Sequence, residues 1–209
     1  YVDIIMFRAM KNADMLELAK HATVPVISGL DDKEHPCQVI TDLMTIKEHK
    51  GKLKGLNFVY LGDGANNMAH SYLLGCGIVG MNVKIVSPKK YWPEKYYVNE
   101  AKKFGINVEI TDKVKDSTKG ADVIATDTWV SMGDEAQKKQ RLKEFKGYTV
   151  NDELMEKANP DAVFMHCLPA YYGYEVTKEV AHGSQSVIFD EAENRMWAQN
   201  AIMVTLCKK

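Results

Sequence analysis

Short apolar runs of strand length recur along the chain from residue 57 onward. Six such runs cover residues 57–61, 82–86, 107–110, 122–125, 162–165 and 186–189. Most of the intervals between them carry apolar residues at the spacing of an amphipathic helix. The interval at 134–146 is highly charged with few apolar residues, and we expect a solvated, mobile helix there rather than a binding patch. Strands that alternate with helices predict a parallel sheet with helices on both faces. We therefore expect an α/β fold built on a doubly wound parallel sheet.

The first fifty residues carry a separate pattern of two short strands and two helices. The second helix is predicted to begin at Pro36, which suits the first helical position, and to continue at helical spacing to Ile46. His35 and Gln38 then lie at its start, where free backbone N–H groups and the helix dipole favour an anion or a polarised carbonyl. The alternative is a capping histidine beside an exposed glutamine. A glycine- and lysine-rich break at residues 51–55 precedes the series of strands.

Polar side chains follow two of the predicted strands directly. His166 and Cys167 come after the run at 162–165, and Asp127 and Ser131 follow the run before it. The carboxyl ends of parallel strands share the edge at which open α/β sheets present functional groups. We therefore expect a carboxylate, an imidazole and a thiol at one site. The alternative is a core histidine beside a buried free cysteine.

A glycine motif, G-D-G-A-N-N, ends the first strand of the series at residues 62–67. It begins like the dinucleotide-binding fingerprint, but the third glycine of G-x-G-x-x-G falls on Asn67. We therefore expect no nucleotide cofactor. Asparagine amides at a helix N-terminus are instead suited to donate to a small carboxylate.

The composition is that of an ordinary globular chain of 209 residues, 45% apolar and 26% charged, with a net charge of −1. The chain has no general excess of positive charge that would favour binding to nucleic acid or to an anionic membrane. No apolar run approaches the roughly 18 residues that a membrane span needs. The four cysteines are scattered without a C-x-x-C pair, which argues against a zinc site or disulfides and for a reducing, cytoplasmic location. Arginine is scarce, and Arg8 and Arg195 are the candidates for a bidentate anion contact.

Five motifs occur together in the order, and at about the spacings, of one enzyme family. They are H-P-C-Q at 35–38, G-D-G-A-N-N at 62–67, D-T-W-V-S-M-G at 127–133, H-C-L-P-A at 166–170 and E-A-E-N-R at 191–195. The chain therefore resembles the ornithine carbamoyltransferases over essentially its whole length. The resemblance implies a carbamoyl-phosphate domain, a Rossmann-like ornithine domain, and a homotrimer in which a neighbouring subunit completes each site. It assigns residues 1–49 to the first domain, 50–187 to the second, and 188–209 to a C-terminal helix that returns to the first.

The resemblance also implies roles for individual residues. Those matched to the carbamoyl-phosphate site are Arg8, His35, Gln38 and Arg195. Those matched to the backbone of L-ornithine are Asn67, Asp127, Ser131 and Met132. Cys167 and the main-chain carbonyl of Leu168 match the groups that face the attacking amine.

The implied reaction is attack of that amine on carbamoyl phosphate, giving citrulline and phosphate. Negative charge grows on the carbonyl oxygen, and we expect Arg8, His35 and Gln38 to donate hydrogen bonds to it. Asp127 and Cys167 are expected to orient the amine and to lower its pKa. The reaction needs no metal and no organic cofactor.

One family feature has no counterpart, since these residues contain no S-x-R-T-R phosphate loop. We expect the chain to lack the first part of the carbamoyl-phosphate domain, and a non-catalytic, amino-acid-binding paralogue is the alternative. A sister transcarbamoylase that uses putrescine or an acylated ornithine is a further alternative. The S-M-G triplet at 131–133 weighs against it, because that triplet is the family's ornithine signature. Either direction of citrulline metabolism fits these residues.

Overall fold

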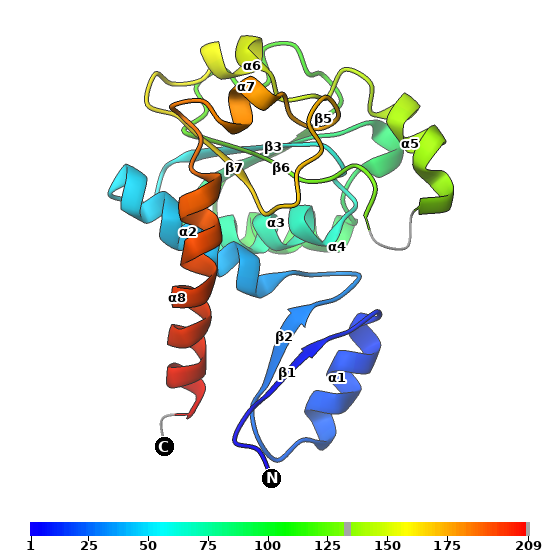
Figure 1. The fold of residues 1–209 in the computed structure, drawn as a ribbon, viewed down its shortest axis with the longest axis vertical. Coiled ribbons are helices and arrows are strands. Elements are labelled where there is room, and N and C mark those ends of the chain that lie inside the picture. The colour runs from blue at the N-terminus through cyan, green and yellow to red at the C-terminus, as the bar shows by residue number, and fades with distance from the viewer. Residues whose placement is uncertain (132–134, 208–209) are drawn as a thin grey trace.

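The computed structural model describes residues 1–131 and 135–207, which form a five-stranded sheet with its helices and a smaller β–α–β unit (Figure 1). The strands are β1 (Ile5–Arg8), β2 (Val26–Leu30), β3 (Asn57–Leu61), β4 (Asn82–Val86), β5 (Val108–Thr111), β6 (Val123–Thr126) and β7 (Val163–His166). The α-helices are α1 (Asn12–His21), α2 (Pro36–Lys50), α3 (Asn67–Val79), α4 (Lys95–Lys103), α5 (Lys138–Glu144), α6 (Asp152–Glu156), α7 (Lys178–Ala181) and α8 (Ile188–Cys207). Two short 3₁₀ turns are η1 (Lys89–Tyr91) and η2 (Glu135–Gln137). Among the described residues, no helix has the length and apolar character needed to cross a membrane.

The large sheet is parallel throughout and has the strand order β5-β4-β3-β6-β7. The chain therefore builds outward from β3 in one direction and then starts again beside it with β6. This reversal is a topological switch point, and open α/β sheets bind ligands in the crevice at the carboxyl ends of the strands there. The predicted doubly wound sheet is confirmed.

Both faces of the sheet are covered, and β3, β6 and β7 are almost entirely buried, whereas Glu109 on the edge strand β5 is exposed. Phe58 and Tyr60 of β3 pack toward α3, where Tyr72 contacts both rings. Val59 and Leu61 of the same strand belong to the core cluster on the opposite face, beneath α6 and α7. A strand buried on both faces loses the alternation of apolar and polar residues, which is why these segments read as continuous apolar runs.

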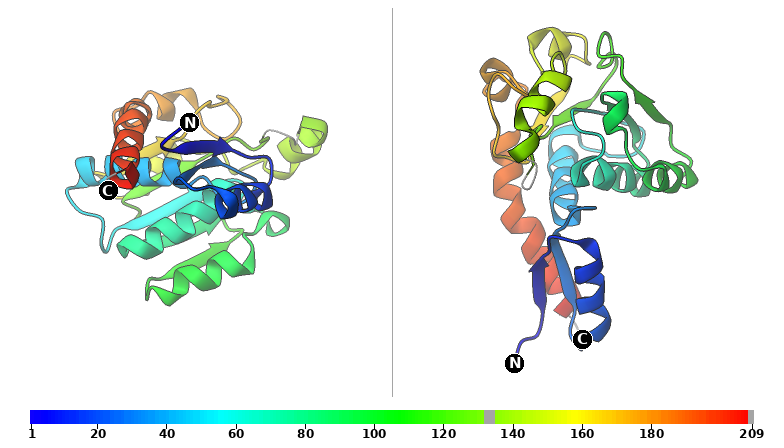
Figure 2. Two further views of the ribbon diagram at one scale, coloured as in Figure 1. Left: turned by 90° about the horizontal axis from the view of Figure 1, so that it is seen from below. Right: turned by 90° about the vertical axis from the view of Figure 1, so that its right-hand side faces the viewer.

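Helices α2 and α8 connect this sheet to the smaller unit of β1, α1 and β2. They pack on each other, and α8 extends away from the sheet on the side where the smaller unit lies (Figures 1 and 2). Their interface is partly polar, since Asn194 Nδ2 donates to Thr45 Oγ1 at 3.0 Å and to Glu48 Oε2 at 2.6 Å. The first turns of the two helices also meet, since Gln38 Nε2 donates to Glu191 Oε1 at 3.1 Å.

One expected strand is replaced by the start of a helix, and one expected solvated helix forms with most of its described side chains exposed but is partly buried. The run at 186–189 is not a strand, because only Ser186 forms a bridge, with Phe164, and α8 begins at Ile188. Acidic residues in the first turn, Asp190 and Glu191, are favoured by the helix dipole and start the helix there. The charged segment at 134–146 was expected to be a solvated helix, but within it the side chain of Arg141 is buried in an ion pair.

Gly75 allows α2 and α3 to approach closely. A Cβ at position 75 would overlap Val39 Cγ1 on α2. We expect Gly75→Ala to lower the free energy of unfolding by about 1 kcal/mol, because overpacking costs ~1–3 kcal/mol and alanine's better helix propensity returns only ~1 kcal/mol. Urea unfolding measures this difference. In a Val39→Ala background the overlap is gone, so the same substitution should stabilise the protein. A loss of equal size in both backgrounds would contradict the packing argument.

Candidate active site

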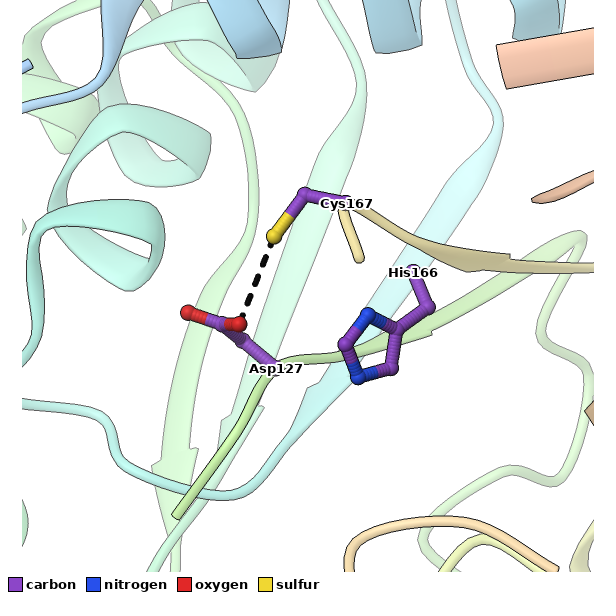
Figure 3. Close-up of side chains that lie close together, drawn as sticks. All are labelled: Asp127, His166 and Cys167. Carbon is purple, nitrogen blue, oxygen red and sulfur yellow. Dashed lines mark hydrogen bonds between the residues drawn. The ribbon is translucent and has the colours of Figure 1, made fainter. Parts of the chain in front are cut away.

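Two strand ends bring a carboxylate and a thiol together at the switch point. Asp127 follows β6 and Cys167 follows β7, and Cys167 Sγ donates to Asp127 Oδ1 at 3.3 Å (Figure 3). The backbone N–H of Thr128 donates to the same oxygen at 2.7 Å. Asp127 is buried, with 8% of its surface exposed. The carboxylate is thus held in a defined position inside the crevice.

Burial controls the protonation of this pair. It raises the pKa of the Cys167 thiol well above its ordinary value, and the charge of Asp127 raises it further. Burial also raises the pKa of Asp127, against an opposing effect of the nearby His166. Cys167 is therefore a neutral thiol that donates a hydrogen bond, and not a thiolate nucleophile.

His166 organises the backbone of the loop that follows β7. Its Nδ1 accepts a hydrogen bond from the backbone N–H of Leu168 at 2.9 Å, so the proton lies on Nε2, which faces Glu175 Oε1 at 3.3 Å. Glu175 Oε1 also accepts from the backbone N–H of Tyr171 at 2.6 Å. Leu168 has a φ of 60°, a strained left-handed conformation that these contacts maintain. The imidazole is a scaffold for the loop.

Three potential metal ligands converge at this point. One ligand atom from each of Asp127, His166 and Cys167 lies within 4.8 Å of the others. Carboxylate, imidazole and thiolate form a donor set that Zn²⁺ accepts. Each of these groups already makes a hydrogen bond within the described part of the chain, so a metal would have to displace those contacts.

A second cluster lies at the N-terminus of α2 and contains cationic side chains. His35 is buried there, and its pKa is lowered to about 3 by burial first and then by the charges of Arg195 and Arg8. The imidazole is therefore neutral at physiological pH. Within the described residues, His35 Nδ1 and Arg195 Nη1 are buried without a hydrogen-bond partner. Unsatisfied buried polar atoms beside a helix N-terminus suit an anionic ligand.

Gln38 has a different orientation from the expected one. Its amide nitrogen donates both hydrogens, to Asp42 Oδ1 at 2.8 Å and to Glu191 Oε1 at 3.1 Å. The group left for a ligand is the amide oxygen, which accepts hydrogen bonds. The expected role of Gln38 as a donor to an oxyanion is therefore corrected to that of an acceptor.

The residues matched to the amino-acid substrate are only partly brought together. Asn67 Nδ2 donates to the backbone carbonyl of Asp31 at 2.8 Å, and Ser131 is half-buried at the end of the loop after β6. Met132 lies outside the described residues. Leu168 is half-buried beside Cys167.

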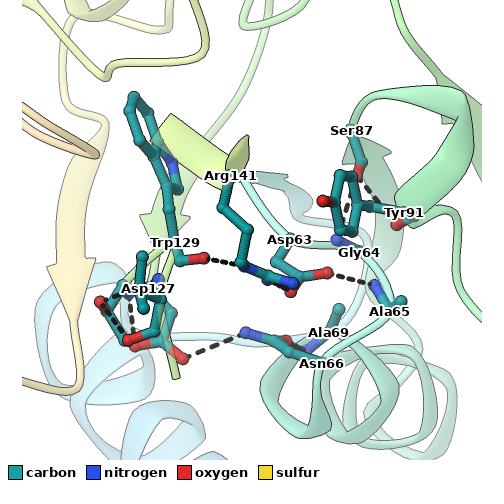
Figure 4. Close-up of polar contacts among 12 residues, drawn as sticks. Asp63, Gly64, Ala65, Asn66, Ala69, Ser87, Tyr91, Asp127, Trp129 and Arg141 are labelled. Carbon is teal, nitrogen blue, oxygen red and sulfur yellow. Dashed lines mark hydrogen bonds and ion pairs between the residues drawn. The ribbon is translucent and has the colours of Figure 1, made fainter. Parts of the chain in front are cut away.

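Asn66 is a contact of the site that sequence reasoning missed. Its Oδ1 caps α3 by accepting from the backbone N–H of Ala69 at 2.9 Å, and its Nδ2 donates to Asp127 Oδ2 at 3.1 Å (Figure 4). The motif places asparagines at both 66 and 67, but the family resemblance matches only Asn67 to the substrate. The N-cap position is the sequence feature that indicates this contact. The capping hydrogen bond fixes the side chain, so its amide nitrogen has a defined direction.

A buried ion pair was also missed. Arg141 of α5 pairs with Asp63 in the loop after β3, and its Nε donates to the backbone carbonyl of Trp129 (Figure 4). Its guanidinium carbon lies 4.8 Å from the centre of the Tyr91 ring. Through these two contacts, Arg141 joins the loop that follows β3 to the loop that follows β6, although the two loops are far apart in sequence. Nothing in the local sequence around Arg141 indicates burial.

Comparison with known proteins gives two family matches. Residues 54–206 match the family model described as "Aspartate/ornithine carbamoyltransferase, Asp/Orn binding domain". Residues 1–48 match the model described as "Aspartate/ornithine carbamoyltransferase, carbamoyl-P binding domain". Together the two matches cover nearly the whole chain.

Individual relatives agree with these matches. The chain is 49% identical over 211 residues to an ornithine carbamoyltransferase from Caldicellulosiruptor saccharolyticus, covering 99% of this chain and 68% of that protein. It is 51% identical over 210 residues to one from Oceanobacillus iheyensis, covering 99% and 65%. The solved structure of ornithine carbamoyltransferase from Pyrococcus furiosus superposes with a TM-score of 0.92 at 45% identity, covering 97% of this chain and 66% of that one. The chain thus spans about two-thirds of the length of the relatives it matches.

The raised pKa of Cys167 predicts slow alkylation. Because the thiolate is the reactive form, iodoacetamide at pH 8 should modify the exposed Cys207 well before Cys167. Asp127→Asn removes a charge that disfavours the thiolate, so the rate at Cys167 should rise about threefold. Peptide mass spectrometry over time measures both sites, with Cys207 as the internal control. Equal rates at the two cysteines in the unaltered protein would refute the prediction.

Proposed function

Because the chain belongs to the aspartate/ornithine carbamoyltransferase family, we propose that the protein transfers the carbamoyl group of carbamoyl phosphate to the side-chain amine of L-ornithine. The products are citrulline and phosphate. Relatives named ornithine carbamoyltransferase, which are about 50% identical over nearly the whole chain, support this activity. The observation that carries the proposal is that two buried atoms, His35 Nδ1 and Arg195 Nη1, have no hydrogen-bond partner among the described residues, at the start of α2 and on α8, helices that both contact β7.

Carbamoyl phosphate binds at the N-terminus of α2 in this proposal. Arg8 and Arg195 supply positive charge for the phosphate, and the amide N–H groups of the helix add to it. A neutral His35 donates one hydrogen bond to the carbonyl oxygen, where negative charge develops during attack. The amide oxygen of Gln38 accepts from the carbamoyl nitrogen, since both of its own hydrogens are occupied.

Ornithine binds in the second part of the crevice. Asp127 faces its ammonium group, with Asn67, Ser131 and Met132 completing the contacts to the amino-acid head. Cys167 and the carbonyl of Leu168 face the side-chain amine. That amine must be neutral to attack, and bringing the two substrates together supplies much of the rate enhancement. The carboxylate of Asp127 alone would favour the ammonium form of a nearby amine, so the dry surroundings of the site, rather than Asp127, lower its pKa.

We also propose the larger organisation that accompanies this reaction. Residues 1–49 belong to the carbamoyl-phosphate domain, 50–187 form the ornithine domain, and 188–209 return to the first. Exposed apolar side chains on the smaller unit, such as Met6 and Leu16, support further covering protein there, and a homotrimer would supply part of it. Four free cysteines support a reducing, cytoplasmic location.

Substrate choice provides the direct test. The full-length protein should make citrulline from ornithine and carbamoyl phosphate, with a kcat/KM for putrescine lower by about 100-fold or more, because a site built for polar groups rejects an analogue that lacks them. Colorimetric assay of the carbamoylated product measures both rates. Asp127→Asn serves as a comparison, since it should impair ornithine use and leave carbamoyl-phosphate binding unchanged. Comparable turnover of the two amines would point to a sister transcarbamoylase, and binding without product to a non-catalytic paralogue.

Replacing the thiol tests the amine side of the site. Cys167→Ser should lower kcat/KM for ornithine about tenfold through loss of the larger, positioned thiol group. The packing cost should be about 1 kcal/mol, so the fold remains intact. Steady-state kinetics and thermal unfolding give the two quantities, and Cys207→Ser on the exposed end of α8 is the matched control. Unchanged kinetics, or an unfolded variant, would return Cys167 to a purely structural role.

A further inference from the structure

Glu191 connects the two clusters of the site. It lies in the first turn of α8 and is 1% exposed. Its Oε1 accepts from the side-chain amide of Gln38 at 3.1 Å, and its Oε2 accepts from the backbone N–H of His166 at 2.9 Å. One carboxyl group therefore contacts the α2 segment that carries Gln38 and the β7 end that carries Cys167.

Asp42 completes a buried carboxyl pair with Glu191. Its residue is 0% exposed, and it accepts from Gln38 Nε2 at 2.8 Å and from the hydroxyl of Tyr72 at 2.7 Å. Both carboxyls accept from the same nitrogen, Gln38 Nε2, so they lie close together. Burial raises the pKa of both, that of Asp42 to about 6 and that of Glu191 well above its usual range.

Packing alone does not explain this arrangement. Two carboxyl groups and an amide are removed from water here, and apolar residues of similar volume would fill the same space at a smaller desolvation cost. The polar groups fix the orientation of the Gln38 amide. Both hydrogens of the Gln38 amide are committed to Asp42 and Glu191, which leaves its oxygen as the group able to contact a ligand.

We propose that Glu191 is a positioning residue that orients the Gln38 amide and holds the His166–Cys167 end of β7 in register with it. The proposal rests on the proposed function, because Gln38 is taken to contact carbamoyl phosphate and Cys167 to face the amine. Glu191 itself touches neither substrate. It acts through Gln38 on one side and through the backbone of β7 on the other.

Glu191→Gln is the informative substitution in the full-length protein. The new side chain has one accepting oxygen for two donors, the Gln38 amide and the His166 N–H. We expect kcat/KM for carbamoyl phosphate to fall about tenfold, with the melting temperature within a few degrees of the unaltered protein. Glu193→Gln, an exposed position two residues along the same helix, is the matched control and should leave both unchanged.

A double-mutant cycle separates positioning from general structural support. Once Gln38→Ala removes the amide, the single oxygen introduced at position 191 is free for His166. The double variant should therefore be within about twofold of Gln38→Ala alone, rather than showing the product of the two losses. Multiplicative losses, or a Glu191→Gln variant that matches Glu193→Gln, would overturn the proposal.

Two further measurements keep the result decisive. If Glu191→Gln fails to fold, Asp42→Asn leaves one accepting oxygen for the Gln38 amide and the Tyr72 hydroxyl and should lower the same constant at least about threefold, so an unchanged constant would refute the role. Calorimetric titration with carbamoyl phosphate compares the same variants without turnover, and weaker binding by Glu191→Gln than by Glu193→Gln is the expected result. An unaltered protein that binds carbamoyl phosphate but makes no citrulline would contradict the proposed reaction while leaving the Glu191 comparison readable.

Discussion

The contact between the first turns of α2 and α8 is the one on which the site depends. These helices are distant in sequence, and their interface includes buried polar groups: Gln38 against Glu191, and Asn194 against Thr45. Such groups fix the relative position of two helices more narrowly than apolar packing does, because each hydrogen bond tolerates little displacement. The same contact brings Arg195 close enough to His35 to lower its pKa. If this contact were lost, Arg195 would no longer lie beside His35. The end of β7 would also lose its hydrogen bond to Glu191.

Burial favours the neutral form of each shifted acidic or imidazole group in the site. It lowers the pKa of His35 and raises those of Cys167, Asp127 and Glu191, so in each case it favours the neutral form. Arginine does not follow this pattern, since its guanidinium stays charged in proteins. The positive charge of the site is therefore carried by Arg8 and Arg195, while the imidazole and the thiol serve as neutral hydrogen-bonding groups. This division suits a reaction in which a phosphate must be held and an amine must be uncharged.

The sheet was predictable to a large extent. Five of the six apolar runs are strands, because a strand buried on both faces must be apolar along its length, and this signal is local. The run at 186–189 has the same composition, yet it enters a helix, since the acidic residues that follow it favour a helix start. The placement of Asp127 and Cys167 side by side was also predictable, because parallel strands end at one edge. Their contact at 3.3 Å agrees with that expectation.

The sequence by itself determined the α/β class, the parallel sheet, the family and the meeting of Asp127 and Cys167 in the candidate site, whose other residues it proposed. Tertiary structure alone decided what several of those residues can do. Gln38 was expected to donate, but its amide hydrogens are taken by Asp42 on its own helix and by Glu191, which is 153 positions away. Arg141, in a segment that reads as solvated, is buried against Asp63, 78 positions away. The physical reason is that apolar burial follows local periodicity, whereas the direction of a hydrogen bond and the protonation of a buried group depend on partners that only the folded chain brings near.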